Sequence, residues 1–243
     1  MSTCNLPQGL RPLMTHPVLV PFVFLRFCPK LLKMDPDPIL RKSAILTLSF
    51  VALLWGIKLW EWLSDWPLVT MGVYPLSTQN LAGILFGPLI HGSFTHIATN
   101  TFGVLVLGAA LLYGFPKSRW WVLAMIWLLS GIGVWLFGRP SFHIGASGLT
   151  HGLFFFLLVV SVLRRDKRSI ALMMMASLLF GGMFWGVLPS EQHVSFEYHL
   201  FGSAAGVLAA LLFWRADPKP AEKHYDWEDE GDDTPLDETS HPY

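Results

Sequence analysis

The serine at position 147 lies in a run of small residues, Gly145-Ala146-Ser147-Gly148, which suits an exposed nucleophile. Flanking glycines leave a serine hydroxyl accessible and let other backbone approach it. An apolar stretch follows, and if it is a helix, the free N–H groups and positive dipole end at its start would stabilise an oxyanion. Ser147 is therefore a candidate nucleophile. A serine that caps a helix or packs between helices would show the same pattern.

A histidine closer to the end of the chain, His199, is the candidate general base. Gly202 and Gly206 follow it at a spacing that lets a neighbouring helix pack closely, and His199 lies on nearly the same face as Gly202. If that neighbour carries Ser147, the two residues form a Ser-His dyad; otherwise His199 only hydrogen-bonds across helices. The nearby Glu197 is expected at the water interface, so no carboxylate completes a triad.

A third polar group, His91, His96 and Asn100, leads into another apolar stretch. His96 and Asn100 share a helix face, where an imidazole and an amide can donate hydrogen bonds to a developing oxyanion. A rival interpretation is a zinc site made by His91, His96 and His199. It is weaker, because no nearby Glu or Asp supplies the general base of an H-E-x-x-H site. No metal or other cofactor is expected.

The composition places these residues in a membrane protein. Hydrophobic residues make up 53% of the 243 residues and charged residues only 14%, against about a quarter in soluble proteins, and the mean hydropathy is +0.47. The formal net charge of +0 lacks the positive excess of a nucleic-acid-binding protein. Cys4 and Cys28 both lie near the N-terminus, so neither a disulfide framework nor a cysteine-rich metal site is available.

Six apolar stretches are long enough to cross a hydrocarbon core as helices, and none has the two-residue alternation of a barrel strand. We expect them at Ser43–Leu63, Thr95–Tyr113, Arg119–Leu136, Ser147–Leu163, Ser169–Leu188 and Phe196–Trp214. Nearly all Lys and Arg residues lie before the first stretch, in alternate loops and after the last, which predicts that both termini are cytoplasmic. Ser147, Asn100 and His199 then share the opposite depth, which favours chemistry over helix packing.

The two ends of the chain differ from the apolar part. Residues 1–42 are expected to form a cytoplasmic N-terminal arm, with Met34 as an alternative start of translation. Residues 43–214 are expected to form one six-span domain. Residues 215–243 are rich in Asp and Glu and cannot build a core, so we expect a disordered, solvated cytoplasmic tail. A regulatory contact of this tail is an open alternative.

Together, the motifs His91-x4-His96-x3-Asn100, Gly145-x-Ser147-Gly148 and His199-x2-Gly202-x3-Gly206 resemble those of the rhomboid family of intramembrane serine proteases. The resemblance extends from about Ala44 to Trp214. It implies an all-α fold, a six-transmembrane-helix rhomboid-like bundle in which the motif glycines serve helix packing. It further implies that Ser147 is the nucleophile, that His199 is the general base, and that His96 and Asn100 form the oxyanion hole with the Ser147 N–H. His91 matches a position that supports the site structurally.

The implied reaction is hydrolysis of a peptide bond in or near a substrate's transmembrane helix, through an acyl-enzyme and without metal or nucleotide. The implied partners are transmembrane protein substrates and the lipid bilayer, and no nucleic acid. The compact core and the lack of an organellar transit signal favour a bacterial inner membrane. One alternative is an inactive rhomboid-like protein that binds transmembrane helices, although such a protein should lack Ser147 or His199. A transporter or channel would need charges in mid-span, whereas Lys58 and Glu61 lie at an edge.

Three further features of the sequence concern the surroundings of the candidate site. The family commonly has an aromatic residue four positions after the serine, where this chain has His151. We expect His151 to stack on the base or to hydrogen-bond in the site, and a role as the principal base is an alternative. The loop Ser64–Pro88 lacks the family's Trp-x-Arg, so its support must differ. Gly181-Gly182 indicate either a loose point beside which substrate enters or close helix packing.

Overall fold

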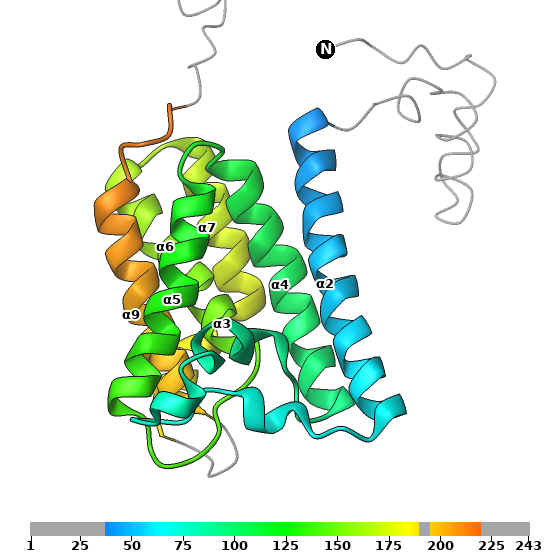
Figure 1. Cartoon of the computed structure of the whole chain (residues 1–243). Helices are drawn as coiled ribbons and strands as arrows, with labels where there is room; N and C mark the ends of the chain where they lie inside the picture. The colour runs from blue at the N-terminus through cyan, green and yellow to red at the C-terminus, as the bar shows by residue number, and fades with distance from the viewer. Residues whose placement is uncertain (1–36, 190–194, 220–243) are drawn as a thin grey trace, which may run out of the picture.

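The computed structural model describes residues 37–189 and 195–219, and this part of the chain is a bundle of helices (Figure 1). The helices long and apolar enough to cross a membrane are α2 (Pro38–Ser64), α4 (Phe94–Gly114), α5 (Arg119–Phe137), α6 (Ser147–Arg164) and α9 (Phe196–Phe213). The described residues contain no strand, only a single antiparallel bridge between Val73 and His143. The predicted all-α membrane bundle is therefore confirmed.

The remaining predicted span, Ser169–Leu188, is not one helix. It forms α7 (Lys167–Phe180) and the short α8 (Met183–Gly186), with Gly181 and Gly182 between them. Glycine has a low helix propensity, and packing normally has to offset it. None of the residues from 177 to 189 is buried, so tertiary packing does not enforce a continuous helix here. The structure thus breaks the span at the two glycines.

The first helix begins earlier than the predicted span, because Pro38 is at its first position and Asp37 caps it. The Asp37 carboxylate accepts a hydrogen bond from the Ile39 N–H at 2.8 Å. Residues 38–42 of the predicted N-terminal arm thus belong to α2. The rest of that arm, including Met34 and both cysteines, lies outside the described residues.

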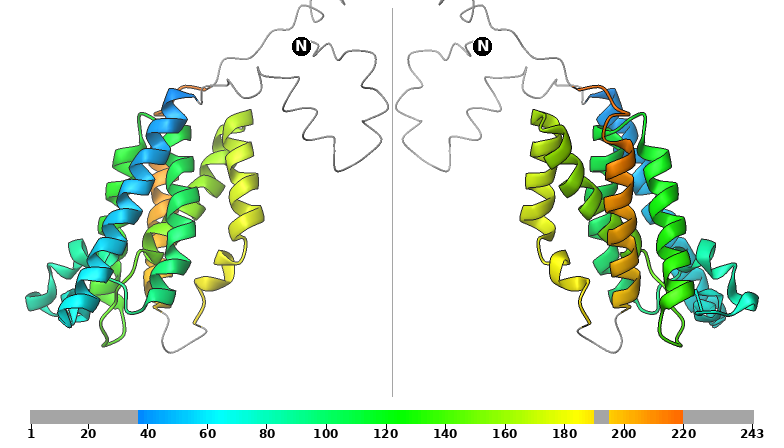
Figure 2. Two further views of the ribbon diagram at one scale, coloured as in Figure 1. Left: turned by 90° about the vertical axis from the view of Figure 1, so that its right-hand side faces the viewer. Right: turned by 90° about the vertical axis from the view of Figure 1, so that its left-hand side faces the viewer.

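Helix α6 lies at the centre of the bundle, and α9 packs directly against it (Figures 1 and 2). A Cβ atom on Gly202 would overlap the backbone of Gly148, and one on Gly206 would overlap the backbone of Gly152. The two helices can approach this closely only because glycine has no side chain. This contact fixes α9, and hence His199, relative to the start of α6.

The segment between α2 and α4 packs against α5 at one end of the bundle. It contains the short helices η2 (Leu68–Met71), η3 (Thr78–Asn80), α3 (Gly83–Phe86) and η4 (Gly87–Leu89). Two indole N–H groups of α5 hold it: Trp127 donates to the Leu85 carbonyl at 3.2 Å, and Trp135 to the Ser77 carbonyl at 3.0 Å. These bonds provide support in a loop that lacks the Trp-x-Arg sequence.

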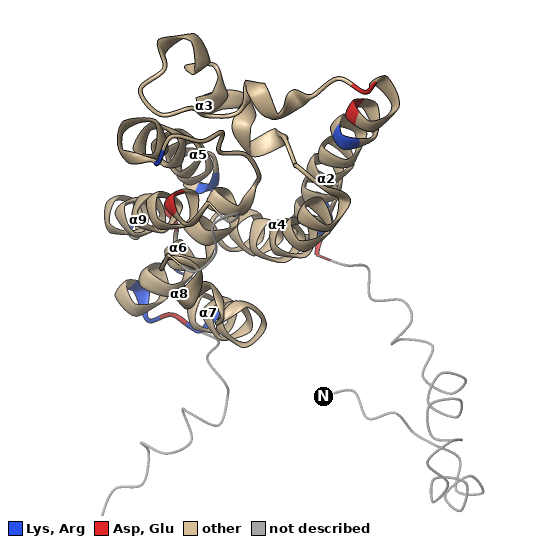
Figure 3. Ribbon diagram, turned by 90° about the horizontal axis from the view of Figure 1, so that it is seen from below, with Lys and Arg blue, Asp and Glu red and all other residues tan. Residues whose placement is uncertain are grey.

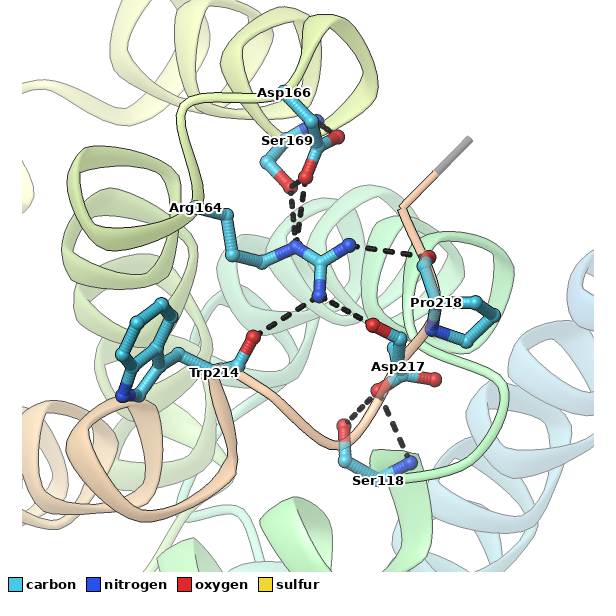
Figure 4. Close-up of polar contacts among 7 residues, drawn as sticks. All are labelled: Ser118, Arg164, Asp166, Ser169, Trp214, Asp217 and Pro218. Atoms are coloured by element: carbon cyan, nitrogen blue, oxygen red, sulfur yellow. Dashed lines mark hydrogen bonds and ion pairs between the residues drawn. The ribbon is translucent and has the colours of Figure 1, made fainter. Parts of the chain in front are cut away.

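The opposite end of the bundle carries most of the described Lys and Arg residues and is here called the basic end. The other end, where the segment between α2 and α4 lies, is here called the site end, and few charges appear when the bundle is viewed from there (Figure 3). At the basic end, Arg164 is only 4% exposed and joins three segments (Figure 4). Its guanidinium donates to Asp166 at 2.7 Å and to the carbonyls of Trp214 and Asp217 at 3.0 and 2.7 Å.

Asp217 extends this cluster to the start of α5. Its carboxylate accepts hydrogen bonds from the Lys117 N–H at 2.6 Å and the Ser118 hydroxyl at 2.6 Å. Asp217 is therefore buried and paired, although it falls within the range predicted as a solvated tail. Residues 220–243, with the other acidic side chains of that prediction, lie outside the described residues.

Candidate active site

A polar cavity of about 800 Å³ opens at the site end and brings together five of the residues singled out from the sequence. They are Ser147, His199, His96, Asn100 and His151. The cavity is also lined by Gly92, Ser93, Thr95, Thr99, Gly103, Phe142, Ile144, Thr150, Met183 and Ser195. The lining residues thus come from α4, from the start of α6, and from α8 and α9.

A second cavity, of about 450 Å³, lies between α2, α4, α5 and α6. Apart from the Thr47 hydroxyl, which is bonded to backbone carbonyls of its own helix, its lining side chains are apolar or aromatic. This cavity has no groups for acid–base or nucleophilic chemistry, so the polar cavity is the candidate active site.

Ser147 is the first residue of α6, not its cap. The cap position is Ala146, and the first helical hydrogen bond runs from the Thr150 N–H to the Ala146 carbonyl at 3.0 Å. Ser147 therefore does not serve as an N-cap, which was one alternative. The N–H groups of the first turn have no carbonyl partner within the helix, so they are oriented outward at its positive end. An anion beside Ser147 would meet these donors.

The turn that leads to Ser147 depends on Gly145. Its φ of +108° lies in a region that L side chains rarely adopt, and a Cβ here would lie 2.7 Å from two ring atoms of His96. The Gly145 N–H donates to the Gly87 carbonyl at 2.9 Å. The turn is thus fixed between η4 and the His96 ring.

His91 supports the same turn from outside the cavity. Its Nε2 accepts a hydrogen bond from the Ala146 N–H at 3.4 Å, and its ring meets the His96 ring edge-on with centroids 5.1 Å apart. Burial, and then positive charge on His96 and Lys58, lower the pKa of His91 to about 4. The ring is therefore neutral near pH 7, which leaves Nε2 able to accept the bond.

Asn100 places an amide in the cavity one helical turn after His96. Its Nδ2 lies 3.0 Å from the His96 carbonyl and donates one of its two hydrogens to it. The side chain is almost buried, at 6% exposure, yet Asn100 lines the cavity. The second amide hydrogen is available to an oxygen held near Ser147.

His199 is oriented by two contacts. Its Nδ1 lies 2.8 Å from the Gly186 carbonyl, and its ring stacks on the His151 ring with centroids 3.9 Å apart and an interplanar angle of 6°. A carbonyl only accepts hydrogen bonds, so Nδ1 carries the proton and Nε2 is the basic nitrogen. No hydrogen bond joins the Ser147 hydroxyl to His199 in the described part of the chain; the two residues share the cavity. Such bonds often close only when substrate is present.

The alternative zinc site would use His91, His96 and His199 as ligands. Within residues 37–189 and 195–219, no group of three or more His, Cys, Asp or Glu side chains is placed to hold a metal ion. His91 and His199 each use one ring nitrogen for a backbone partner, as described above. The observed contacts of these two histidines are therefore hydrogen bonds to the backbone.

Sequence reasoning missed a buried cluster at the start of α9. His143 is 1% exposed; its Nε2 donates to the Arg139 carbonyl at 3.0 Å, and its Nδ1 accepts from the Ser195 hydroxyl at 2.6 Å. Ser195 in turn caps α9 by accepting the Tyr198 N–H. Burial lowers the pKa of His143, which keeps the ring neutral and suited to this bond. The cluster fixes the turn of α9 that carries His199.

Glu197 belongs to this cluster and does not lie at the water interface as predicted. It is 4% exposed, and its carboxylate pairs with the Arg139 guanidinium at 3.0 Å. The prediction was wrong because position 197 was judged from its place near the end of a span. The one signal that the sequence offered for this pair is Arg139, a basic residue two positions after the last residue of α5.

Comparison with known proteins finds a matching family model and several similar mycobacterial proteins. The family model for the Rhomboid domain matches residues 78–216. An uncharacterized protein of Mycobacterium bovis and one of Mycobacterium tuberculosis are each 38% identical over 174 residues, which cover 68% of this chain and 72% of the relative. An uncharacterized protein of Mycobacterium leprae is 36% identical over 180 residues, or 70% of this chain and 71% of the relative.

Proposed function

The chain belongs to the rhomboid family of multi-pass membrane proteins, and we propose that it is an intramembrane serine endopeptidase that uses a dyad of Ser147 and His199. The observation that supports this proposal is the shared cavity. It holds a hydroxyl at a helix start, an imidazole with an unprotonated Nε2, and an amide donor. These are the three groups that acyl transfer requires.

The first half of the proposed reaction forms an acyl-enzyme. Ser147 Oγ attacks the carbonyl carbon of the scissile peptide bond, while His199 Nε2 takes the hydroxyl proton. The carbonyl oxygen becomes an oxyanion, which accepts hydrogen bonds from the free Asn100 amide hydrogen, from His96 and from the Ser147 N–H. As the C–N bond breaks, the His199 imidazolium returns the proton to the leaving amine.

The second half releases the product. A water molecule takes the place of the amine, and His199 Nε2 removes its proton as the oxygen attacks the ester carbonyl of acyl-Ser147. A second oxyanion forms in the same donor set and collapses to a carboxylic acid as the ester C–O bond breaks. The His199 imidazolium returns its proton to Ser147 Oγ, which restores the free serine and the neutral imidazole. No metal or nucleotide takes part in the proposed steps.

We further propose that the substrates are membrane-anchored proteins cleaved in or near a transmembrane helix that unwinds easily, with a small residue before the scissile bond. The excess of Lys and Arg at the basic end supports an orientation with that end in the cytoplasm. Both termini would then be cytoplasmic, and the cavity would open outward. A bacterial inner membrane is the proposed location, with 43–214 as the protease domain between an N-terminal arm and an acidic tail.

Purified full-length protein in detergent, incubated with a panel of single-span reporter proteins, tests the proposal. The wild type is expected to cleave at least one reporter, whereas Ser147→Ala and His199→Ala each lose the activity. Ser161→Ala is a matched control, because Ser161 lies on the same helix, bonds only the Leu158 carbonyl and is remote from the cavity. This variant is expected to cleave like the wild type.

Other outcomes of this experiment would contradict the serine mechanism or the proposed activity. Equal cleavage by Ser147→Ala would refute the serine mechanism, and inhibition by chelators alone would favour a metal site. If the wild type binds the reporters but cleaves none, the chain is an inactive member of its family. Covalent labelling of the wild type, but not of Ser147→Ala, by a fluorophosphonate would support an activated serine independently of the substrate choice.

A further inference from the structure

The proposed general base has its hydrogen-bond partner on a separate short helix. Nδ1 of His199 donates to the carbonyl of Gly186, the last residue of α8, at 2.8 Å. Among the described residues, no carboxylate makes an ion pair or hydrogen bond with His199. A backbone carbonyl therefore takes the place that a carboxylate has in a Ser-His-Asp triad.

We infer that Gly186 is the positioning residue of the dyad, an inference that rests on the proposed function. Its carbonyl selects the tautomer of His199 with the proton on Nδ1, so that Nε2 is free to accept the Ser147 proton. The carbonyl dipole also stabilises the imidazolium that forms when Nε2 is protonated. Gly186 touches neither the substrate nor the reacting atoms; it acts through His199.

This arrangement requires glycine at position 186. A Cβ on Gly186 would lie 2.7 Å from Nε2 of His151 and 3.5 Å from Nδ1 of His199. His151 cannot easily give way, because its ring is stacked on His199 and its Nδ1 donates to the Ser147 carbonyl at 2.8 Å. A side chain at 186 would therefore push α8, and its carbonyl, away from the base.

The segment that carries the Gly186 carbonyl is held loosely. Helix α7 has two buried residues, Ser169 and Ala176, and the chain from 177 to 189 has none. Figure 2 shows α7 and α8 along one side of the bundle. Helix α8 packs against the bundle through Met183 and through Phe184, whose ring meets those of Phe154 and Phe155 with centroids 5.4 and 5.2 Å apart. The alignment of the base thus depends on whether α8 is seated.

Two variants test this inference in the full-length protein. Gly186→Ala crowds the base from α8, and Phe184→Ala removes the aromatic contacts of α8 without touching either histidine. Each is expected to lower kcat for a reporter by about tenfold or more, since small misplacements of a reacting group cost up to about 100-fold, while KM changes little. Gly182→Ala is the matched control, because a Cβ there has no atom within 4 Å and its φ of −60° suits alanine.

Nitrogen-15 NMR of the imidazoles gives a readout that does not depend on cleavage. The His199 signals, identified by their loss in His199→Gln, are expected to show the neutral tautomer with hydrogen on Nδ1 in the wild type and in Gly182→Ala. This signature should weaken in Gly186→Ala and Phe184→Ala. A wild type that cleaves reporters but carries hydrogen on Nε2 of His199 would overturn the inference and leave the proposed function intact. A wild type with the expected tautomer but no cleavage would refute only the proposed function.

Discussion

The imidazole rings of His151 and His199 lie parallel, with centroids 3.9 Å apart and an angle of 6° between their planes. The two residues come from different helices, α6 and α9, and the close glycine contacts between these helices bring the rings together. His151 thus covers one face of His199, the proposed general base, from the position where the family commonly has an aromatic residue. Its Nδ1 is bonded to the Ser147 carbonyl, so its ring is fixed from the nucleophile's own helix.

The first prediction concerns this stack. His151→Phe keeps a flat ring against His199 and is expected to retain most of the activity, whereas His151→Ala removes the ring and should lower kcat by about tenfold, because the base becomes less well oriented. Reporter cleavage by the two purified variants measures the difference. If both variants were inactive while folded, His151 itself would be the principal base.

A second prediction concerns Gly145, where both the backbone conformation and the lack of room for a side chain require glycine. Gly145→Ala places a side chain at φ +108° and 2.7 Å from the His96 ring, so we expect a loss of about 1–3 kcal/mol in stability and a large loss of activity. Thermal unfolding in detergent and reporter cleavage measure the two effects. Gly56→Ala is the control, since nothing lies within 4 Å of a Cβ there, and it should be neutral or slightly stabilising.

A third prediction isolates the oxyanion donor. Asn100→Ala removes the free amide hydrogen from the cavity and is expected to lower kcat by about 100- to 1,000-fold with a smaller change in KM. Thr101→Ala tests the next position on the same helix, whose hydroxyl accepts the Trp55 indole N–H at 2.9 Å and faces α2. Steady-state kinetics on one reporter should separate the two. Equal kcat values for the two variants would exclude Asn100 from the oxyanion hole.

A fourth prediction concerns Arg164 at the basic end. Arg164→Ala leaves Asp166 and three backbone carbonyls without their partner, so we expect a loss of about 3–5 kcal/mol in the free energy of unfolding. Arg165→Ala changes the neighbouring, exposed arginine and should alter stability by no more than about 0.5 kcal/mol. Unfolding of both variants in detergent provides the comparison. Similar midpoints would show that the Arg164 cluster does not stabilise the bundle.

A fifth prediction follows from the neutral His91. Burial first, and then nearby positive charge, lower its pKa from 6.5 to about 4 in the folded protein. As the pH falls below 6.5, the unfolded chain therefore binds a proton at this position that the folded chain does not bind until about pH 4. Folding stability is complete above the unfolded pKa and decreases across that window by roughly 3 kcal/mol.

His91→Gln removes this titration but keeps an acceptor for the Ala146 N–H. Its unfolding free energy, measured in detergent between pH 7 and pH 4, is expected to change less with pH than that of the wild type. Parallel curves for the two proteins would show that His91 does not contribute to the acid sensitivity.

Several parts of this protein were predictable because they depend on local sequence. Apolar composition over about 20 residues is sufficient to mark a membrane helix, and the Ser93 and Ser195 caps set helix starts close to the predicted limits. The spacing of Gly202 and Gly206 also indicated a close helix contact. Ser147, His199, His96 and Asn100 could be named as candidates because polar side chains at membrane depth are rare, and the structure brings the four into one cavity.

Other features could not be read from the sequence, because they depend on which distant segments meet. The break of the fifth span at Gly181-Gly182 required knowing that none of the residues from 177 to 189 is fully buried in the bundle. The burial of Glu197 required its approach to Arg139, 58 positions earlier in the chain. The support of the turn at Gly145 comes from His91 and Gly87, which no local pattern links to it.

The sequence by itself thus determined the membrane class, most of the helices and the candidate reacting groups, since residue type and periodicity carry that information. Only the tertiary structure decided how His199, the proposed base, is held. A backbone carbonyl has no signature in a sequence, because every residue has one. That the carbonyl of Gly186 meets His199, while His151 covers the other side of the ring, follows from the packing of α8 and α9 against α6.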